Sequence, residues 1–237
     1  TFEPPVRCIP GSYSGYYVIN NSRVLRTSDG QLIIPASLHR SGRGNGKIDI
    51  ERRGTVHFFS SADDGRTWSE DMGMIALGHA AHSRSGLQEP GLIELPNGVL
   101  YAYMRTDLFA QYESFSYDSG GSWTPACPSA FSSPCSPLKI AQNPYTGEYF
   151  AVWNPIPNYF GRDIAPKTAG RTPLVLARSE NGLDFSEPEL IEDDPTRGFC
   201  YPSLFFTDEK TLLLSYCCGG AEEGGFLNCL KIRKLKL

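Results

Sequence analysis

Two octapeptides decide the fold of this chain: Ser61-Ala62-Asp63-Asp64-Gly65-Arg66-Thr67-Trp68 and Ser116-Tyr117-Asp118-Ser119-Gly120-Gly121-Ser122-Trp123. Both read S-x-D-x-G-x-[ST]-W. Ser and Asp side chains bond the backbone of tight turns, Gly takes left-handed backbone conformations, and Trp buries a large ring. Because each octapeptide follows a β-rich run, the pair predicts a repeated β unit. We therefore expect turn-stabilising roles for Ser61, Asp63, Gly65, Trp68, Ser116, Asp118, Gly120 and Trp123.

Apolar runs of strand length, bounded by turn residues, recur along the whole chain. They form four groups: 16–20, 23–27, 31–36 and 55–60; 91–95, 99–104 and 112–117; 137–141, 149–153 and 173–178; and 201–206, 211–216 and 226–233. Residues 179–185 look like a worn third copy of the octapeptide. The insertion at 40–53, rich in Gly, Arg and Lys, is predicted to be a mobile loop.

The spacing of the octapeptides predicts the architecture. Their serines, at 61, 116 and 179, lie 55 and then 63 residues apart, which suits one four-stranded sheet plus loops. Repeated four-stranded sheets around an axis make a β-propeller, whereas the repeats of a parallel β-helix are much shorter. We predict an all-β chain, a single β-propeller domain over residues 1–237 with about four blades.

Composition narrows the function classes. The 237 residues carry a net charge of only −4 and no basic stripe, which argues against a nucleic-acid partner. No apolar run approaches the roughly 20 residues that a membrane helix needs. No cofactor or metal is expected, since the seven cysteines show no C-x-x-C spacing. Most cysteines are expected to be free thiols, with Cys127 and Cys135 the best candidates for a disulfide. The start at Thr1, without Met, favours a processed or excised chain.

Four segments carry a resemblance to a known family. They are Gln88-Glu89-Pro90-Gly91-Leu92-Ile93-Glu94-Leu95-Pro96-Asn97-Gly98, Tyr101-Ala102-Tyr103-Met104-Arg105, Arg171-Thr172-Pro173-Leu174-Val175-Leu176 and Cys200-Tyr201-Pro202-Ser203-Leu204. Together with the two octapeptides, which match aspartate boxes, they resemble the sialidase (neuraminidase) superfamily over nearly the whole chain. The resemblance implies a sialidase-type propeller of six blades.

The resemblance also implies roles for four residues. Tyr201 would be the nucleophile, Glu89 would take its proton, and Arg105 and Arg171 would bind the substrate carboxylate. A guanidinium fork binds a carboxylate through two hydrogen bonds and keeps its charge. Sialidases use a Tyr nucleophile instead of the usual pair of carboxylates. The implied reaction releases terminal sialic acid from a glycan with retention, and a secreted or periplasmic location is expected.

Several points stay open at this level. Asn21, Arg23 and His39 are softer candidates for contacts with sugar hydroxyls. Trp153, Asn154 and Tyr159 could form a sugar-stacking wall or an ordinary packed loop. The family's first carboxylate-binding Arg and its general-acid Asp have no counterpart, so the front of the propeller is expected to be missing. Two rivals follow: a non-catalytic propeller that binds glycan or protein, and a propeller hydrolase acting on another sugar.

Overall fold

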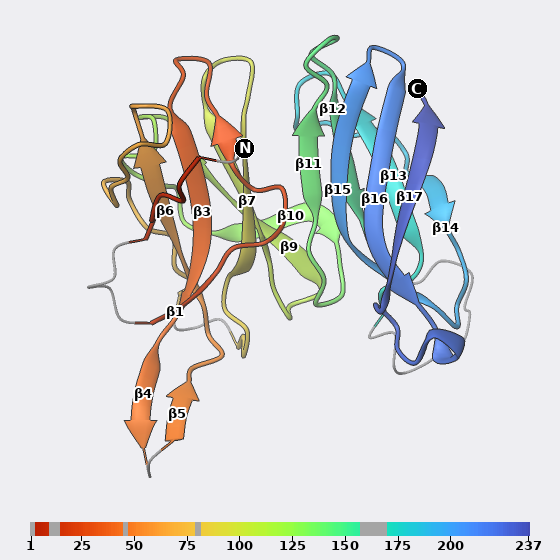
Figure 1. Ribbon diagram of the computed structural model, residues 1–237, viewed down its shortest axis with the longest axis horizontal. Helices are drawn as coiled ribbons and strands as arrows, with labels where there is room; N and C mark the ends of the chain where they lie inside the picture. Colours follow the sequence, from red (N-terminus) through yellow and green to blue (C-terminus); the bar gives the residue numbers. More distant parts are fainter. Residues whose placement is uncertain (1–2, 10–14, 45–46, 79–81, 157–169) are drawn as a thin grey trace. The chain divides into compact units, whose positions relative to one another are not determined.

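Strands make up almost all regular structure in this protein. The computed structural model describes residues 3–9, 15–44, 47–78, 82–156 and 170–237 (Figure 1). Within them, the only helical turn is the short 3-10 segment η2, Ala221–Glu223. By compactness the chain divides into unit 1, residues 1–102 and 113–127, and unit 2, residues 103–112 and 128–237.

The first sheet lies in unit 1 and is built around one central strand. Its strands are β1 (Tyr16–Val18), β2 (Leu25–Arg26), β3 (Leu32–His39) and β6 (Thr55–Ser61). β6 runs antiparallel to β3 along nearly its whole length, while β1 and β2 pair with the two ends of β3. Residues 69 and 75 bridge to β6 and mark a fourth strand position.

The insertion at 40–53 differs from the prediction. It contains the strands β4 (Ser41–Gly44) and β5 (Lys47–Ile50), which pair antiparallel. The backbone N–H of Glu51 donates to the Arg40 carbonyl at 2.8 Å and extends this ladder. The prediction of a mobile loop was wrong because a hairpin ladder uses backbone groups, so it does not require the apolar alternation on which the prediction relied.

The second sheet has the strand order β10-β9-β8-β7. Its strands are β7 (Gln88–Glu94), β8 (Leu100–Arg105), β9 (Ala110–Ser116) and β10 (Cys127–Ser132). A hairpin turn at Asn97-Gly98 joins β7 to β8, where Gly98 has φ 80° and its N–H donates to the Leu95 carbonyl at 2.9 Å. β10 was not predicted, because its exposed polar residues follow no clear alternation.

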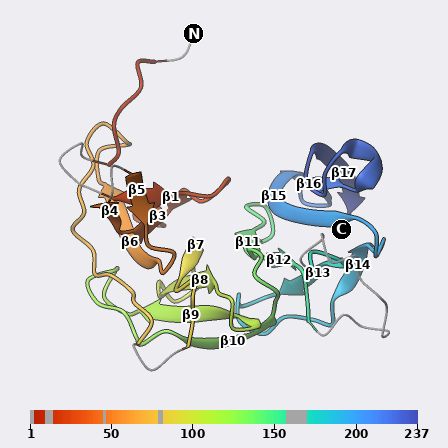
Figure 2. The same ribbon diagram turned by 90° about the horizontal axis from the view of Figure 1, so that it is seen from below.

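The third and fourth sheets lie in unit 2 and pack on each other (Figure 2). Their strands are β11 (Lys139–Gln142), β12 (Tyr149–Trp153), β13 (Leu174–Ser179), β14 (Glu189–Glu192), β15 (Gly198–Asp208), β16 (Thr211–Gly219) and β17 (Cys229–Lys236). The core between them contains Phe150, Val152, Leu174, Leu176, Phe199, Leu204, Phe206, Leu212, Leu214, Tyr216 and Cys218. This apolar layer holds β12 and β13 against β15 and β16.

The octapeptides occupy equivalent places in successive sheets. The first joins β6 to the segment at 69–75, the second joins β9 to β10, and the worn copy at 179–185 joins β13 to β14. Each therefore connects the third and fourth strands of a meander. The ring of Trp123 stacks on Phe58 of the first sheet with centroids 4.5 Å apart, so the second octapeptide also packs within unit 1.

All seven cysteines have free thiols. The predicted disulfide between Cys127 and Cys135 was therefore wrong. Cys127 opens strand β10, where its Sγ faces the Glu113 carbonyl at 4.0 Å. The sulfur of Cys135 instead accepts a hydrogen bond from Nε of Arg105 at 3.2 Å.

Candidate functional site in unit 2

Tyr201 lies at an irregular point of strand β15. Cys200 pairs with Cys217 and Ser203 pairs with Ser215, so Tyr201 and Pro202 together oppose a single residue of β16. This is a β-bulge, a feature that re-aims side chains and is common near active sites. Tyr201 has φ 57°, a left-handed conformation that is unusual for a bulky residue. Such strained backbone is concentrated at functional sites.

Arg171 contacts Tyr201 directly. Its guanidinium carbon lies 5.5 Å from the centre of the Tyr201 ring, within cation–π range. The carbonyl of Arg171 accepts the backbone N–H of Phe199 at 2.8 Å, which ties the two segments together just before the bulge. Within the described residues, the buried Nε of Arg171 has no hydrogen-bond partner. The structure thus brings together two of the residues that the sequence singled out.

Asn154 holds these two segments in place. Its side chain is 1% exposed, and its Nδ2 donates to the Pro173 carbonyl at 2.8 Å and to the Phe199 carbonyl at 3.1 Å. Pro173 lies two residues after Arg171, and Phe199 lies two residues before Tyr201. Asn154 is therefore an internal clamp, which the sequence did not indicate because its partners are 19 and 45 residues away.

Two of the three residues considered for a sugar-stacking wall, Trp153 and Asn154, lie in the described part of the chain. Trp153 is the last residue of β12 and only 7% exposed, and its ring lies 5.0 Å from Phe131 in an edge-on contact. Trp153 and Asn154 are both buried, which favours the packed alternative for these two residues. Tyr159 lies outside the described residues.

Arg105, the third predicted residue of unit 2, ends strand β8 and is partly exposed. Its hydrogen bond to the Cys135 sulfur uses Nε. The next residue, Thr106, is fully buried and accepts the Leu108 N–H at 3.1 Å while donating to the Ala110 carbonyl at 2.7 Å. A closed turn therefore follows Arg105 and fixes where strand β8 ends.

Glu89 belongs to unit 1 and repeats the local arrangement of Tyr201. It is the second residue of β7, it has φ 46°, and a proline follows it. The preceding segment is held closely, since Leu87 N–H donates to the Gly54 carbonyl at 3.0 Å. A Cβ on Gly86, which has φ 61°, would meet that carbonyl oxygen at 2.5 Å, so only glycine fits there. Glu89 and Tyr201 are thus both non-glycine residues in the left-handed region near the start of a sheet's first strand.

The softer candidates of unit 1 are held in separate ways. His39 ends β3 and is 6% exposed, and its Nδ1 lies 3.0 Å from the Glu51 carbonyl. Arg23 is 4% exposed. Asn21 is exposed in a turn, where its N–H donates to the Asn20 side chain at 2.9 Å. His39 and Arg23 are thus both buried, and a contact of these three residues with sugar hydroxyls stays a prediction.

Asp63 and Asp118 accept hydrogen bonds within their own octapeptide turns. Thr67 donates to Asp63 from its N–H at 2.8 Å and from its hydroxyl at 2.6 Å, while Gly65 N–H donates to Ser61 Oγ at 2.9 Å. Hydrogen bonds from Thr67 hold the pKa of Asp63 at about 2. The second octapeptide repeats this network, with Ser122 donating twice to Asp118 at 2.8 and 2.7 Å. These carboxylates are therefore committed to turn geometry.

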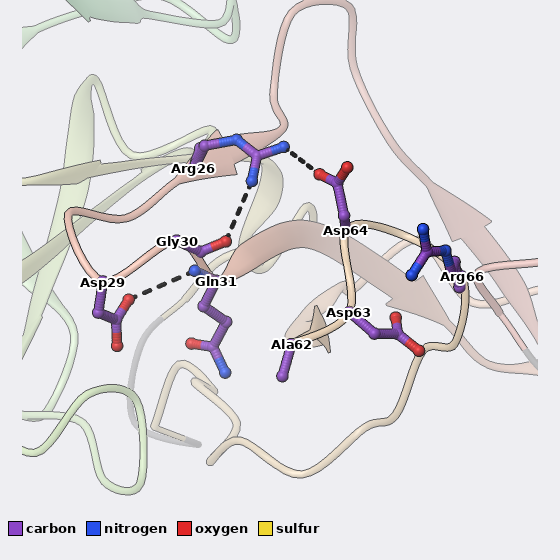
Figure 3. A pocket seen from close by; sticks show the side chains of 8 residues that line it. All are labelled: Arg26, Asp29, Gly30, Gln31, Ala62, Asp63, Asp64 and Arg66. Atoms are coloured by element: carbon purple, nitrogen blue, oxygen red, sulfur yellow. Dashed lines mark hydrogen bonds and ion pairs between the residues drawn. The ribbon is translucent and has the colours of Figure 1, made fainter.

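An open cleft of about 790 Å³ lies beside the first octapeptide (Figure 3). Its lining is polar and contains Arg26, Asp29, Gly30, Gln31, Ala62, Asp63, Asp64 and Arg66. Arg26 and Asp64 form an ion pair across it at 2.5 Å, with side chains 55% and 71% exposed. An ion pair this exposed contributes little. The cleft contains none of the predicted substrate-binding residues.

Among the residues that the structure describes, no group of three or more His, Cys, Asp or Glu side chains is placed to hold a metal ion. In the same part of the chain, no helix has the length and apolar character to cross a bilayer.

Comparisons with known proteins place this geometry in a wider context. Residues 1–214 match the BNR repeat-like domain family. Curated proteins include no significant match. Similar solved structures include a protein of unknown function from Dyadobacter fermentans, at 17% identity and TM-score 0.65, covering 92% of this chain and 53% of that one.

Two further similar structures are enzymes. One is the alpha-L-arabinanase of Penicillium chrysogenum complexed with arabinobiose, at 15% identity and TM-score 0.56, covering 95% of this chain and 63% of that one. The other is Trypanosoma rangeli sialidase, at 18% identity and TM-score 0.59, covering 90% of this chain and 30% of that one.

These likenesses confirm the predicted all-β class and the sialidase-type β-propeller, here with four blades. At such identities they concern the fold alone. The chain spans about half the length of the Dyadobacter protein and 30% of the sialidase. The fold is thus one that sialidases and arabinanases share.

Proposed function

The chain belongs to the BNR repeat-like domain family, and we propose that it is part of a retaining glycoside hydrolase. This enzyme would release terminal sialic acids from glycoconjugates at the site in unit 2. The observation that carries the proposal is the contact between Arg171 and Tyr201, with the guanidinium 5.5 Å from the ring centre. The partner is a glycan, and the proposed location is secreted or periplasmic.

The chemistry of sialic acid accounts for this pair of residues. Its anomeric carbon carries a carboxylate, which would repel a carboxylate nucleophile and attract a guanidinium. A phenol approaches without like charge, and sialidases use such a nucleophile. A cation beside the ring stabilises the negative charge that the phenol oxygen gains as its proton leaves. Arg171 would thus serve both the substrate carboxylate and Tyr201.

Two further roles rest on the resemblance of sequence segments. Arg105 is proposed as a second guanidinium for the substrate carboxylate. Glu89 is proposed as the base that takes the Tyr201 proton, and its left-handed backbone, at φ 46°, supports a functional role. No residue of this chain is proposed as the general acid.

The decisive experiment uses leaving groups of different acidity. Without a general acid, an aryl sialoside with an acidic phenol should be cleaved, while a sialyl-oligosaccharide with a sugar leaving group should react far more slowly. The methyl ester of the same aryl sialoside, which lacks only the negative charge, is the matched control and should not react. Equal cleavage of acid and ester would contradict the assigned role of the arginines.

A second candidate function comes from the similarity to an arabinanase structure. A propeller hydrolase acting on a neutral sugar would cleave an aryl arabinofuranoside and leave the aryl sialoside intact. Binding of either sugar without cleavage would instead support a non-catalytic, glycan-binding propeller. Assaying both aryl glycosides and both free sugars with one preparation separates the three outcomes.

A further inference from the structure

Four of the seven cysteines lie in one three-stranded sheet, β15-β16-β17, as two directly opposed pairs. Cys200 of β15 is the register partner of Cys217 in β16, and Cys218 of β16 is the register partner of Cys229 in β17. Neighbouring residues of a strand point to opposite faces, so each face of the sheet carries one pair. The two pairs differ in their surroundings.

The Cys218–Cys229 pair has a geometry that a disulfide can use. Opposed residues of antiparallel strands have Cα atoms roughly 4.5–5.5 Å apart, and disulfides span roughly 4.4–6.8 Å. β17 is the last strand of the sheet order, so only β16 constrains it within the sheet. The connection at 220–228 contains Gly220, Gly224 and Gly225, which allow its backbone to adjust.

The two thiols of this pair differ in exposure. Cys229 is partly exposed and offers an entry point, while Cys218 is 5% exposed and sits behind it in the core. Burial raises the pKa of the Cys218 thiol, and the nearby Cys229 raises it further, whereas the cations of Arg197 and Lys231 oppose the shift. By contrast, Cys200 in the other pair is fully buried.

We propose that Cys218 and Cys229 form a redox-active dithiol that closes reversibly to a disulfide by exchange with a small-molecule disulfide such as oxidised glutathione. The Cys229 thiolate attacks the S–S bond of oxidised glutathione and expels one glutathione thiolate, which takes up a proton. The Cys218 thiolate then attacks the Cys229 sulfur of the mixed disulfide and expels the second glutathione. Two protein thiols are oxidised, and one glutathione disulfide is reduced to two thiols.

A disulfide between Cys218 and Cys229 would covalently join the two strand ends that flank the connection at 220–228. This connection contacts the start of β15, since Glu223 forms an ion pair with Arg197 at 2.5 Å and a Cβ on Gly198 would meet the Phe226 carbonyl at 2.8 Å. Exposed disulfides are among the easily reduced ones, and Cys229 is partly exposed. The pair would therefore open and close with the ambient thiol balance.

The experiment equilibrates the folded chain with a series of reduced-to-oxidised glutathione ratios, blocks remaining thiols, and digests it with a protease that cuts after glutamate. Cleavage at Glu222 and Glu223 separates Cys218 from Cys229. We expect a linked peptide whose mass is two hydrogen atoms below the summed masses of the two free peptides. It should be at least about tenfold more abundant than after the same equilibration in denaturant. Cys218→Ser and Cys229→Ser should each abolish it.

Cys217→Ser is the matched control, because it removes the adjacent thiol and keeps the proposed pair. The linked peptide should persist in this variant. Absence of the linked peptide from the native protein at every ratio would overturn the proposal. A link that survives Cys218→Ser would also overturn it, because the bond would then belong to Cys217.

Discussion

Arg171 holds its guanidinium carbon 5.5 Å from the centre of the Tyr201 ring. The two residues are 30 positions apart in sequence, and they are not paired with each other in a strand ladder. The contact depends on the bulge that turns Tyr201 out of β15 and on the Asn154 clamp between the two segments.

Tyr201→Phe tests the nucleophile. The change keeps the ring beneath Arg171 and deletes only the hydroxyl, so the melting temperature should stay nearly unchanged. Cleavage of an aryl sialoside should fall by roughly a thousandfold or more, because the attacking atom is gone. Tyr216→Phe is the control for loss of a phenol from the same sheet, since that hydroxyl bonds Glu192. Activity retained in Tyr201→Phe would remove this residue from the nucleophile role.

Arg171→Gln tests the carboxylate contact. Charged hydrogen bonds are worth about 1.5–3 kcal/mol, so affinity for sialic acid should drop roughly tenfold to a hundredfold. Arg178→Gln is a matched control, because Arg178 follows in the strand after Arg171 and also lies over an aromatic ring, Phe150 at 5.4 Å. Titration calorimetry with sialic acid and with its methyl ester measures the affinity of each variant. Equal losses in the two variants would mean that Arg171 has no specific part in binding.

Asn154→Ala tests the clamp. The change leaves the Pro173 and Phe199 carbonyls buried without their donor, which should lower the free energy of unfolding by about 2–4 kcal/mol. Because the clamp aligns the segments of Arg171 and Tyr201, kcat should also fall more than KM rises. Gln142→Ala, which removes an exposed side-chain hydrogen bond to the Gly147 carbonyl, should change neither quantity. A stable Asn154→Ala protein with full activity would contradict this interpretation.

The octapeptide turns predict a pH dependence of stability. The pKa of Asp63 in the folded chain is about 2, below the ordinary 3.8, so the folded state binds fewer protons than the unfolded state. The associated stabilisation is complete above pH 3.8 and is lost as the pH falls towards about 2. Asp118 shifts in the same direction through its bonds from Ser122. Urea unfolding between about pH 5 and pH 2.5 should show this loss.

Asp63→Asn with Asp118→Asn is the corresponding variant. Asn cannot titrate, so the slope of stability against pH should flatten over this interval. The fold should survive, because the worn third copy already uses Asn181, which accepts the N–H groups of Leu183 and Asp184 at 2.9 Å each. An unchanged slope in the double variant would assign the acid sensitivity to other carboxylates.

Much of the fold was predictable because its signals are local. The hydrogen bonds of each octapeptide connect residues two to four positions apart, so the motif carries its own turn. The strand runs of the four sheets were placed to within a few residues for the same reason, since alternation and turn residues are readable in a short window. The hairpin of β4 and β5 and the edge strands β10 and β14 lacked this pattern, and they were missed.

The sequence alone therefore determined the repeated β unit, the turns that close it and the residue types suited to a sialoside. Only the tertiary structure decided that Arg171 lies over Tyr201, that Asn154 clamps their segments, and that Cys218 faces Cys229. These relationships join residues 11 to 45 positions apart through strand register, a bulge and burial. Register and bulges arise from the packing of whole sheets, because a shift of one residue exchanges the two faces of a strand.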